Sequence, residues 1–554
     1  MWSSNRFADP LLEAILARRF GSEGEALAFV ADTAFQAPAD DCLPNIAAAV
    51  ARVAAATANQ ERIVVFGDYD VDGVAATALC VLAIQAASGG TANLGARLPS
   101  RADGYGLRPE VIREIAASGA TLLITVDCGS SDHENIDLAR ELGMDVVVFD
   151  HHQLTGPPVD ATVVSTQLAG EAACRDLSAA GVLYLFAVAL TRAGFDLGNG
   201  PGEEPTRLLD LASLGLIADV VPLSGLARSM VRAGLRQLRA GRRPGLSALA
   251  GRAGVTLDAV TSEDVAFKLA PRLNAAGRMD NPRLALGLLL TDDPATAERR
   301  VSQLEQLNRQ RRAATDLVFA EARAQVGEMA HLDRRRILLV HAPNWHAGVL
   351  GVVAAKLTDA YGRPAVVLSD ADGVSRGSAR SVPGFDIGRA IAASSELVLG
   401  HGGHCQAAGL TMETALVPDL IAALEAAADR DELPLNQPAE ILIDADLPVE
   451  RLERATAELL SVLEPFGAGN PKPLLRLRGA RLHSYRALGQ DGRHLKLFVS
   501  TPGGEVAILA WNASGRSREL VGRRRLDLVV TLGVDRWNGQ RRLHAELKDF
   551  RALD

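Results

Sequence analysis

Acidic side chains follow three successive predicted strands, at the point where each strand ends. The segments 62–66, 121–126 and 144–149 are short, apolar and rich in β-branched residues, and helix-forming sequence separates them. This alternation predicts an α/β fold with a parallel sheet that helices cover on both faces. Ligands of such sheets bind beyond the carboxyl ends of the strands. The pattern gathers five aspartates and two histidines at that edge. They are Asp68, Asp70, Asp72, Asp127, Asp150, His151 and His152.

Carboxylates gathered this closely repel one another, which raises their pKa values or destabilises the fold. Divalent cations remove the repulsion. Aspartate oxygen with some imidazole and no sulfur suits Mn²⁺ or Mg²⁺ better than structural zinc. A single Asp-x-Asp is usually a solvated turn, and a single His-His pair is usually a surface feature. Because all of them fall at successive strand ends, the sequence predicts a metal site.

Composition limits which cellular compartment and which type of metal site we expect. The five cysteines are scattered without a C-x-x-C pair, which argues against a disulfide framework and against a cysteine zinc site. The longest apolar run, 179–190, is too short to cross a bilayer. The N-terminus lacks the pattern of a signal peptide. We therefore expect a cytoplasmic protein without a membrane segment.

The remainder of the chain divides into recognisable segments. Asp293-Pro294 is a helix start signal, and no further Gly or Pro occurs before Gly327, which predicts a connecting helix roughly 50 Å long. A second α/β pattern and a tail of short strands with Gly turns follow it. The expected domains are an N-terminal helical segment 1–55, a catalytic domain 56–290, the connecting helix 291–328, a second, smaller α/β domain 329–430 and a β-barrel 431–554.

Charge is distributed unevenly along the chain. The formal net charge is −9, yet residues 471–554 contain 17 Lys/Arg against 8 Asp/Glu. Such a basic module favours a nucleic-acid partner. Trp511 and Trp537 could stack on bases there, or they could simply fill the barrel.

Several motifs resemble those of the DHH phosphoesterases. Gly67–Gly73 reads GDYDVDG, the third predicted strand ends in Asp150-His151-His152, and residues 210–223 resemble the family's fourth motif, which supplies Asp219. Pro271–Arg278 reads PRLNAAGR, which is typical of the RecJ branch. Three further segments resemble the DHH-associated domain, namely 345–351, 377–381 and 402–409. The basic tail resembles the oligonucleotide-binding (OB) fold of that branch.

The resemblance implies a catalytic site with two divalent ions, Mn²⁺ or Mg²⁺. The catalytic residues would be Asp70, Asp72, Asp127, His151, His152 and Asp219. Asp70, Asp72, Asp127, His151 and Asp219 would hold the two ions, with Asp72 or Asp127 as the bridge. Asp68 and His152 are either ligands or groups just outside the ligand shell. His152 could also contact the phosphate or protonate the leaving group.

The resemblance also implies a set of substrate-binding residues: Arg101, Arg272, Asn274, Arg278, His346, Ser378, Arg380, Gly403 and His404. Arg101, Ser378 and Arg380 are candidates for a pocket that holds a terminal 5′ phosphate. Arg272 or Arg278 could instead form a structural ion pair.

The function that the resemblance implies is 5′→3′ exonuclease activity on single-stranded DNA in repair and recombination, by two-metal-ion hydrolysis. We expect a monomer, with a single-strand-binding protein and other repair proteins as partners. One alternative is a DHH phosphoesterase of short oligonucleotides, cyclic dinucleotides or pyrophosphate. Another is a scaffold without catalysis, which would be expected to have lost metal ligands. An ATP-driven motor is disfavoured because the chain has no Gly-Lys pair and hence no P-loop.

Overall fold

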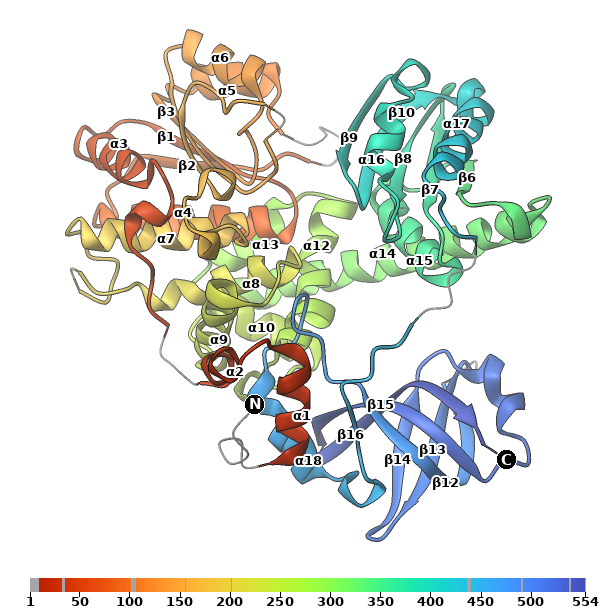
Figure 1. Ribbon diagram of the computed structural model, residues 1–554. Coiled ribbons are helices and arrows are strands. Elements are labelled where there is room, and N and C mark those ends of the chain that lie inside the picture. The colour runs from red at the N-terminus through yellow and green to blue at the C-terminus, as the bar shows by residue number, and fades with distance from the viewer. Residues whose placement is uncertain are drawn as a thin grey trace.

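Two α/β units stand side by side above a β-barrel in the computed structural model (Figure 1). The long helix α14 (Pro294–Glu328) leads from the first unit toward the second and runs beneath the second. The structure describes residues 9–31, 35–100, 106–154, 156–200, 202–435, 440–489, 492–537 and 540–553.

The first unit contains the predicted parallel sheet, with strand order β2-β1-β3-β4-β5. Its strands are β1 (Ile63–Phe66), β2 (Leu94–Arg97), β3 (Leu122–Val126), β4 (Asp145–Asp150) and β5 (Thr162–Ser165). One face packs on α3 (Ile46–Ala58), α4 (Val71–Ala87) and α7 (Ala179–Arg192), and the other on α5 (Pro109–Ala117) and α6 (His133–Glu141). The central strands are predominantly apolar because helices bury both faces.

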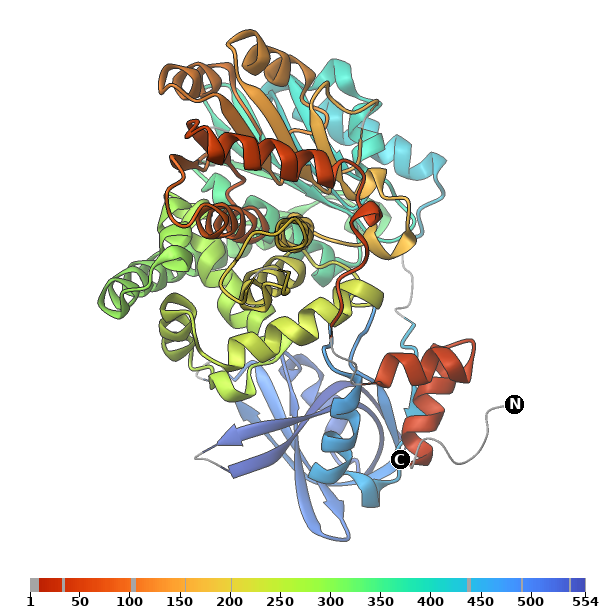
Figure 2. The ribbon, with the colours of Figure 1, turned by 90° about the vertical axis from the view of Figure 1, so that its left-hand side faces the viewer.

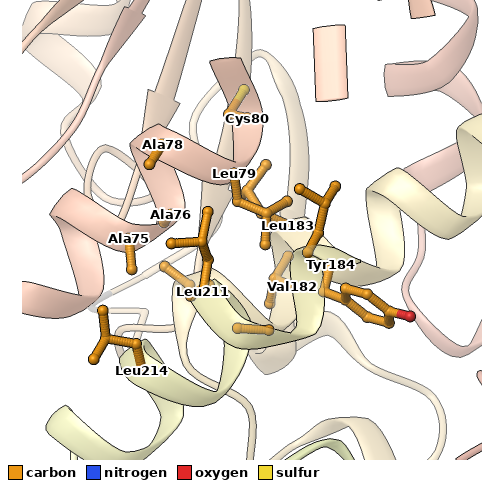
Figure 3. Packing of buried hydrophobic residues seen from close by; sticks show 14 of the residues in the cluster. Ala75, Ala76, Ala78, Leu79, Cys80, Val182, Leu183, Tyr184, Leu211 and Leu214 are labelled. Carbon is orange, nitrogen blue, oxygen red and sulfur yellow. The ribbon is translucent and has the colours of Figure 1, made fainter. Parts of the chain in front are cut away.

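Behind the sheet, α4 and α7 pack against α8 (Leu209–Ala218), as Figure 3 shows for Leu79, Leu183 and Leu211. The contact between these helices is close. A Cβ at Gly215 of α8 would lie 2.5 Å from the Cβ of Ala180 and 2.2 Å from Oδ1 of Asp72. Only glycine fits between these two atoms, so this packing also shapes the site at the start of α4.

Further helices complete the unit and lead out of it. They are α9 (Gly225–Arg239), α10 (Pro244–Ala253), α11 (Ser262–Asp264), α12 (Ala270–Met279) and α13 (Arg283–Leu290). A π-helical turn, Val265–Leu269, joins α11 to α12. The predicted connecting helix is confirmed as α14 (Pro294–Glu328). The Asp293 side chain accepts hydrogen bonds from the backbone N–H groups of Ala295 and Thr296.

The second α/β unit has a mixed sheet of order β6-β7-β8-β10-β9, in which only β6 and β7 pair in parallel. The strands are β6 (Leu338–Pro343), β7 (Ala365–Ala371), β8 (Val374–Arg380), β9 (Gly400–His404) and β10 (Ala407–Glu413). The helices are α15 (Leu350–Tyr361), α16 (Ile387–Ala392) and α17 (Val417–Arg430).

The tail forms the expected barrel, which closes because β12 pairs with both β13 and β15. Its elements are β11 (Ala445–Asp446), α18 (Arg454–Leu460), β12 (Leu475–Leu488), β13 (His494–Thr501), β14 (Gly504–Ala510), β15 (Arg525–Trp537) and β16 (Gln540–Ala552).

The N-terminal helices α1 (Pro10–Arg19) and α2 (Glu23–Val30) belong to the core of this barrel. Leu12, Ile15 and Leu16 of α1 are buried there together with Leu463 and Leu477. Figure 2 shows both helices, in dark red, beside the blue barrel. By contrast, α3 packs on the first sheet, so the first 55 residues contribute to two different hydrophobic cores.

One expectation about the cysteines is wrong. Cys42 and Cys174 form a disulfide, with their Cα atoms 6.3 Å apart. Both lie in the core where α3 meets α7, and their separation of 132 residues gives no signal in the sequence. Among the helices that the structure describes, none combines the length and apolar character that a bilayer crossing requires.

Candidate active site

The turn after β1 brings the first three aspartates to the edge of the sheet. Asp68 is buried behind the turn, and Asp70 caps α4 by accepting a hydrogen bond from the Gly73 N–H at 3.0 Å. A Cβ at Gly73 would lie 2.7 Å from that of Asp68, so a larger residue would push the turn away from the helix. The glycine thus keeps Asp68 and the start of α4 together.

Asp72 lies in the first turn of α4 and is held by the start of α7. Its carboxylate accepts hydrogen bonds from the Ser178 hydroxyl at 2.7 Å and from the backbone N–H groups of Ala179 and Ala180 at 2.7 and 3.1 Å. The positive end of a helix suits a carboxylate. Burial nevertheless raises the pKa of Asp72, and the nearby charge of Asp70 adds to this effect.

Asp127 follows β3 and adopts a positive φ of 64°, which is uncommon outside glycine. This left-handed residue turns the chain sharply at the end of the strand. Its side chain is buried, and burial raises the pKa of Asp127 well above its ordinary value. The charges of Asp72 and Asp70 act in the same direction.

His151 lies at the centre of the cluster, among carboxylates from three elements. Its Nε2 atom is 3.1 Å from Oδ1 of Asp127 and 3.9 Å from Oδ2 of Asp72. Its Nδ1 atom is 3.7 Å from Oδ2 of Asp219, which follows the last turn of α8. Burial, and then the charge of Asp72, raise the pKa of Asp219 to about 7.

Asp150 orients the second histidine, a role that the sequence alone did not reveal. Its Oδ1 atom lies 2.8 Å from Nδ1 of His152 and accepts the backbone N–H groups of both histidines, while Oδ2 accepts the Ser130 hydroxyl at 2.6 Å. Burial opposes ionisation, but these hydrogen bonds outweigh it and lower the pKa of Asp150 to about 2. Burial would lower the pKa of His152, yet Asp150 raises it to about 9.

These side chains suit divalent cations. Three groups each bring ligand atoms within 4.8 Å of one another: Asp68, Asp70 and Asp127; Asp72, His151 and Asp219; and Asp127, His151 and His152. All the donors are oxygen or imidazole nitrogen, which fits Mn²⁺ or Mg²⁺. Burial, and then mutual repulsion, raise the pKa values of Asp72, Asp127 and Asp219, and bound cations would favour the ionised forms of these side chains.

The second α/β unit faces this cluster through β9. The ring of His404 stacks at 6.3 Å from that of His152, with 16° between the ring planes. Burial lowers the pKa of His404, and the two histidines opposite contribute to the shift. Gly403 has a φ of 145°, and a Cβ there would lie 2.3 Å from the Ala407 carbonyl oxygen. The predicted pair Gly403 and His404 therefore lies across from the metal edge.

Ser378 and Arg380 on β8 come together at the first turn of α15. A Cβ at Gly351 would lie 2.9 Å from Nη2 of Arg380 and 3.4 Å from Oγ of Ser378. The missing side chain leaves room for both groups beside the positive end of a helix, an arrangement that favours anions. His346 precedes α15, and its Nδ1 accepts the Gly348 N–H at 3.1 Å.

Helix α12 carries Arg272, Asn274 and Arg278 between the two units. Arg272 donates to Glu305 of α14 at 2.7 Å and to the Lys268 carbonyl at 2.7 Å, which is the geometry of a structural ion pair. Arg278 donates to the Gly348 carbonyl at 3.1 Å and so joins α12 to the second unit. Asn274 is half-buried on the same helix. Substrate contact by these three residues stays a prediction.

Two predicted residues lie partly or wholly outside the described part of the chain. These are Arg101 and the side chain of Trp537. Trp511 is 51% exposed and packs edge-on against His494 with ring centroids 4.9 Å apart, so it does not fill the barrel.

Comparison with known families agrees with this architecture. Residues 62–216 match the DHH family, N-terminal domain, residues 335–430 match the DHHA1 domain, and residues 443–549 match the RecJ OB domain. The fold and the acidic site therefore define a DHH-family phosphoesterase with its DHHA1 domain.

Full-length relatives narrow this class. The chain is 32% identical to the single-stranded-DNA-specific exonuclease RecJ of Bacillus subtilis (strain 168), over 98% of this chain and 68% of that protein. It is 33% identical to the RecJ of Escherichia coli (strain K12), over 87% of this chain and 86% of that protein. The chain belongs to the RecJ family of single-stranded-DNA-specific exonucleases.

Solved structures agree. The RecJ–Mn²⁺ complex from Thermus thermophilus superimposes with a TM-score of 0.80 and 31% identity, covering 98% of this chain and 78% of that one. The Mg²⁺ complex of RecJ from the same organism gives a TM-score of 0.75 and 30% identity, covering 98% of this chain and 75% of that one.

Proposed function

We propose that this metal-dependent single-stranded-DNA exonuclease removes nucleotides from the 5′ end, with two divalent ions held at the carboxylate edge. Family membership gives the substrate class and the type of reaction. The observation that carries the metal site is the convergence of Asp72, Asp127 and Asp219 on His151.

The ligands that we propose divide into two sets. Asp68, Asp70 and Asp127 would hold one ion, and Asp72, His151 and Asp219 the other. When bound, such ions activate a water molecule and neutralise charge on the scissile phosphate. Asp127 and His151, which belong to different sets, lie 3.1 Å apart, so the two proposed sets adjoin.

His152 contributes a positive charge beside this cluster. Asp150 lies within hydrogen-bond distance of Nδ1 and orients the ring, and we propose that Nε2 faces the substrate. A protonated imidazole in this position would contact the scissile phosphate. His404 stacks against the same ring and would close the other side of that phosphate.

The 5′→3′ polarity of digestion would come from the second α/β unit. Ser378 and Arg380, beside the start of α15, would form an anion site in the second unit. A guanidinium group can bind a terminal phosphate with two hydrogen bonds. A 5′ phosphate held there would place the first phosphodiester bond over the carboxylate edge.

The barrel would bind the strand beyond the two α/β units, with Trp511 as a stacking surface and the basic side chains against phosphates. We further propose that the enzyme acts in repair and recombination, where a single-strand-binding protein shares its substrate.

The direct test uses single-stranded DNA labelled at the 5′ or the 3′ end, incubated with the protein and Mn²⁺. We expect the 5′ label to be released first as a mononucleotide, while a blunt duplex stays intact. Initial release of the 3′ label would contradict the polarity. A preference for a 5-mer over a 50-mer would instead indicate a phosphoesterase of short oligonucleotides.

A further inference from the structure

The segment 166–178, which connects β5 to α7, holds two of the proposed metal ligands. Near its start, the Gln167 side chain donates to the His151 carbonyl at 3.0 Å. At its end, the Ser178 hydroxyl donates to the Asp72 carboxylate at 2.7 Å. Asp72 and His151 lie in the same group of candidate ligands. The conformation of this segment therefore sets the geometry of one ion site.

The middle of the segment is anchored at a single point. Of residues 170–176, Cys174 alone is buried, and the others are exposed. The backbone N–H groups of Cys174 and Arg175 donate to carbonyls three residues earlier, both at 3.2 Å, in and beside the short helical turn η3 (Ala172–Cys174). Such local hydrogen bonds do not tie a segment to its surroundings. The disulfide to Cys42 is what joins this stretch covalently to the core.

Cys42 lies on a part of the chain that α7 holds without the disulfide. It ends the short turn η1 (Asp40–Cys42). Arg192, the last residue of α7, donates to the Asp40 carboxylate at 2.6 Å and to two backbone carbonyls just before it at 2.7 and 3.1 Å. Opening the disulfide would therefore loosen the 166–178 segment and leave η1 in place.

We propose that the Cys42–Cys174 pair is a redox switch of metal affinity. In the disulfide form, the anchored segment holds Asp72 and His151 in place for the ion that they share with Asp219. In the dithiol form, that ion binds more weakly. This inference rests on the metal site proposed above, and it makes the nuclease most active at low Mn²⁺ under oxidising conditions.

Reduction changes one covalent bond. A dithiol reductant supplies two electrons and two protons, the S–S bond breaks to give two thiols, and the reductant closes a disulfide of its own. Glutathione disulfide reverses the reaction, because the protein disulfide forms again and two molecules of glutathione are released. Both sulfurs are buried, so the exchange requires local opening of the segment.

The expected size of the effect follows from what happens when groups that orient metal ligands are changed. Their loss typically weakens metal binding by about 10–100-fold. We expect the Kd of one Mn²⁺ to rise roughly tenfold on reduction. The ion at Asp68, Asp70 and Asp127 should keep its affinity, because Gln167 and Ser178 contact the other set of ligands.

The experiment compares the two forms by calorimetric titration with Mn²⁺, in a Cys405→Ser background that removes the exposed thiol. Dithiothreitol in dilute urea reduces the protein, and desalting under argon removes both before the titration. Thiol counting in denaturant should find two thiols in the disulfide form, Cys80 and Cys128, and four after reduction. Amide hydrogen exchange of residues 166–178 should be faster in the reduced form, with or without metal.

Substitutions isolate the cysteine pair. The double variant Cys42→Ala/Cys174→Ala should bind Mn²⁺ like the reduced form and should not respond to redox conditions. Cys80→Ala removes another buried thiol, within α4, and should keep the full response. In Ser178→Ala, one ion should bind weakly in both forms, because the hydrogen bond from the segment to Asp72 is lost.

Three results would overturn the switch. Four thiols after treatment with glutathione disulfide would show that the pair does not form the bond. Equal Mn²⁺ affinity in the two forms, with a lower melting temperature on reduction, would make the disulfide a support of the fold alone. If neither form binds Mn²⁺, the proposed metal site fails as well. If affinity responds to reduction but digestion starts at the 3′ end, the proposed polarity fails while the switch stands.

Discussion

Nδ1 of His152 lies 2.8 Å from Oδ1 of Asp150, so the last residue of β4 fixes the ring of the second histidine after it. Asp150 is almost completely buried and accepts several hydrogen bonds at once. The aspartate thus positions a neighbour, while the histidines face the metal edge.

We predict that Asp150→Asn lowers kcat by roughly 10–100-fold, the range seen when partners of histidine ligands are changed. Asparagine keeps the shape, but it removes the charge that favours the protonated ring of His152. The measurement is steady-state hydrolysis of a 5′-phosphorylated strand, with circular dichroism to verify folding. Asp145→Asn, at the exposed start of the same strand, should retain activity. Unchanged kcat in Asp150→Asn would contradict the positioning role.

We predict that Asp127→Asn abolishes hydrolysis yet stabilises the metal-free protein, by on the order of 1 kcal/mol. Burial raises the pKa of Asp127, so its ionised form is disfavoured in the folded state, and a neutral amide removes that cost. Binding of single-stranded DNA should persist. The measurements are thermal unfolding in EDTA and strand binding by anisotropy. A large loss of stability would show instead that Asp127 is a structural residue.

Metal ions should stabilise wild type by an amount that grows with the logarithm of their concentration above Kd. Mn²⁺ at 100 times its Kd should add about 2.7 kcal/mol per site to the free energy of unfolding. EDTA should remove both this stabilisation and the activity, and added Mn²⁺ or Mg²⁺ should restore them. Asp127→Asn serves as the control, because its melting temperature should respond weakly to Mn²⁺. An identical response in both proteins would place the ions elsewhere.

The anion site on the second unit predicts a preference for phosphorylated ends. Arg380→Ala should lose roughly 10–100-fold of kcat/KM on a 5′-phosphorylated strand, since a charged hydrogen bond contributes about 1.5–3 kcal/mol. The same variant should match wild type on a 5′-hydroxyl strand. Arg376→Ala removes an equal charge from an exposed position of the same strand and should keep the preference. Equal losses on both ends would exclude a terminal-phosphate pocket.

The barrel can be tested without deleting it. Trp511→Ala should weaken binding of a 40-mer roughly five- to one-hundredfold, the range of base stacking, and leave binding of a 5-mer unchanged. Val521→Ala, another exposed apolar residue of the barrel, is the control. Affinity for the 40-mer that equals wild type would show that Trp511 does not contact the strand.

Local patterns were sufficient to predict the main elements. The strands β1, β3 and β4 are predominantly apolar, and their order along the chain places the acidic residues that follow or end them at one edge. The start of α14 was predictable because Asp293 caps the first turn of the helix and Pro294 is its first residue, so the signal is local. Asp219 could be predicted as a ligand only from the resemblance to a family, because it follows the helix α8 and not a strand of the sheet.

Contacts between distant segments left no comparable signal. The Arg272–Glu305 ion pair joins α12 to α14 through residues 33 positions apart. The Asp150–His152 hydrogen bond is local, but it depends on side-chain rotamers that no pattern specifies. The apolar face of α1 shows that it packs on something, but not that its partner is the barrel. The disulfide between Cys42 and Cys174 likewise depends on how α3 meets α7.

The shared core of α1 and the barrel has a consequence for synthesis. The leucines of α1 leave the ribosome about 430 residues before the first barrel strand, a delay of roughly 20–90 s at ordinary elongation rates. Until then Ile15 and Leu16 have no partner to cover them. A chain whose synthesis stops early would keep the apolar face of α1 exposed and become a target for chaperones and proteases.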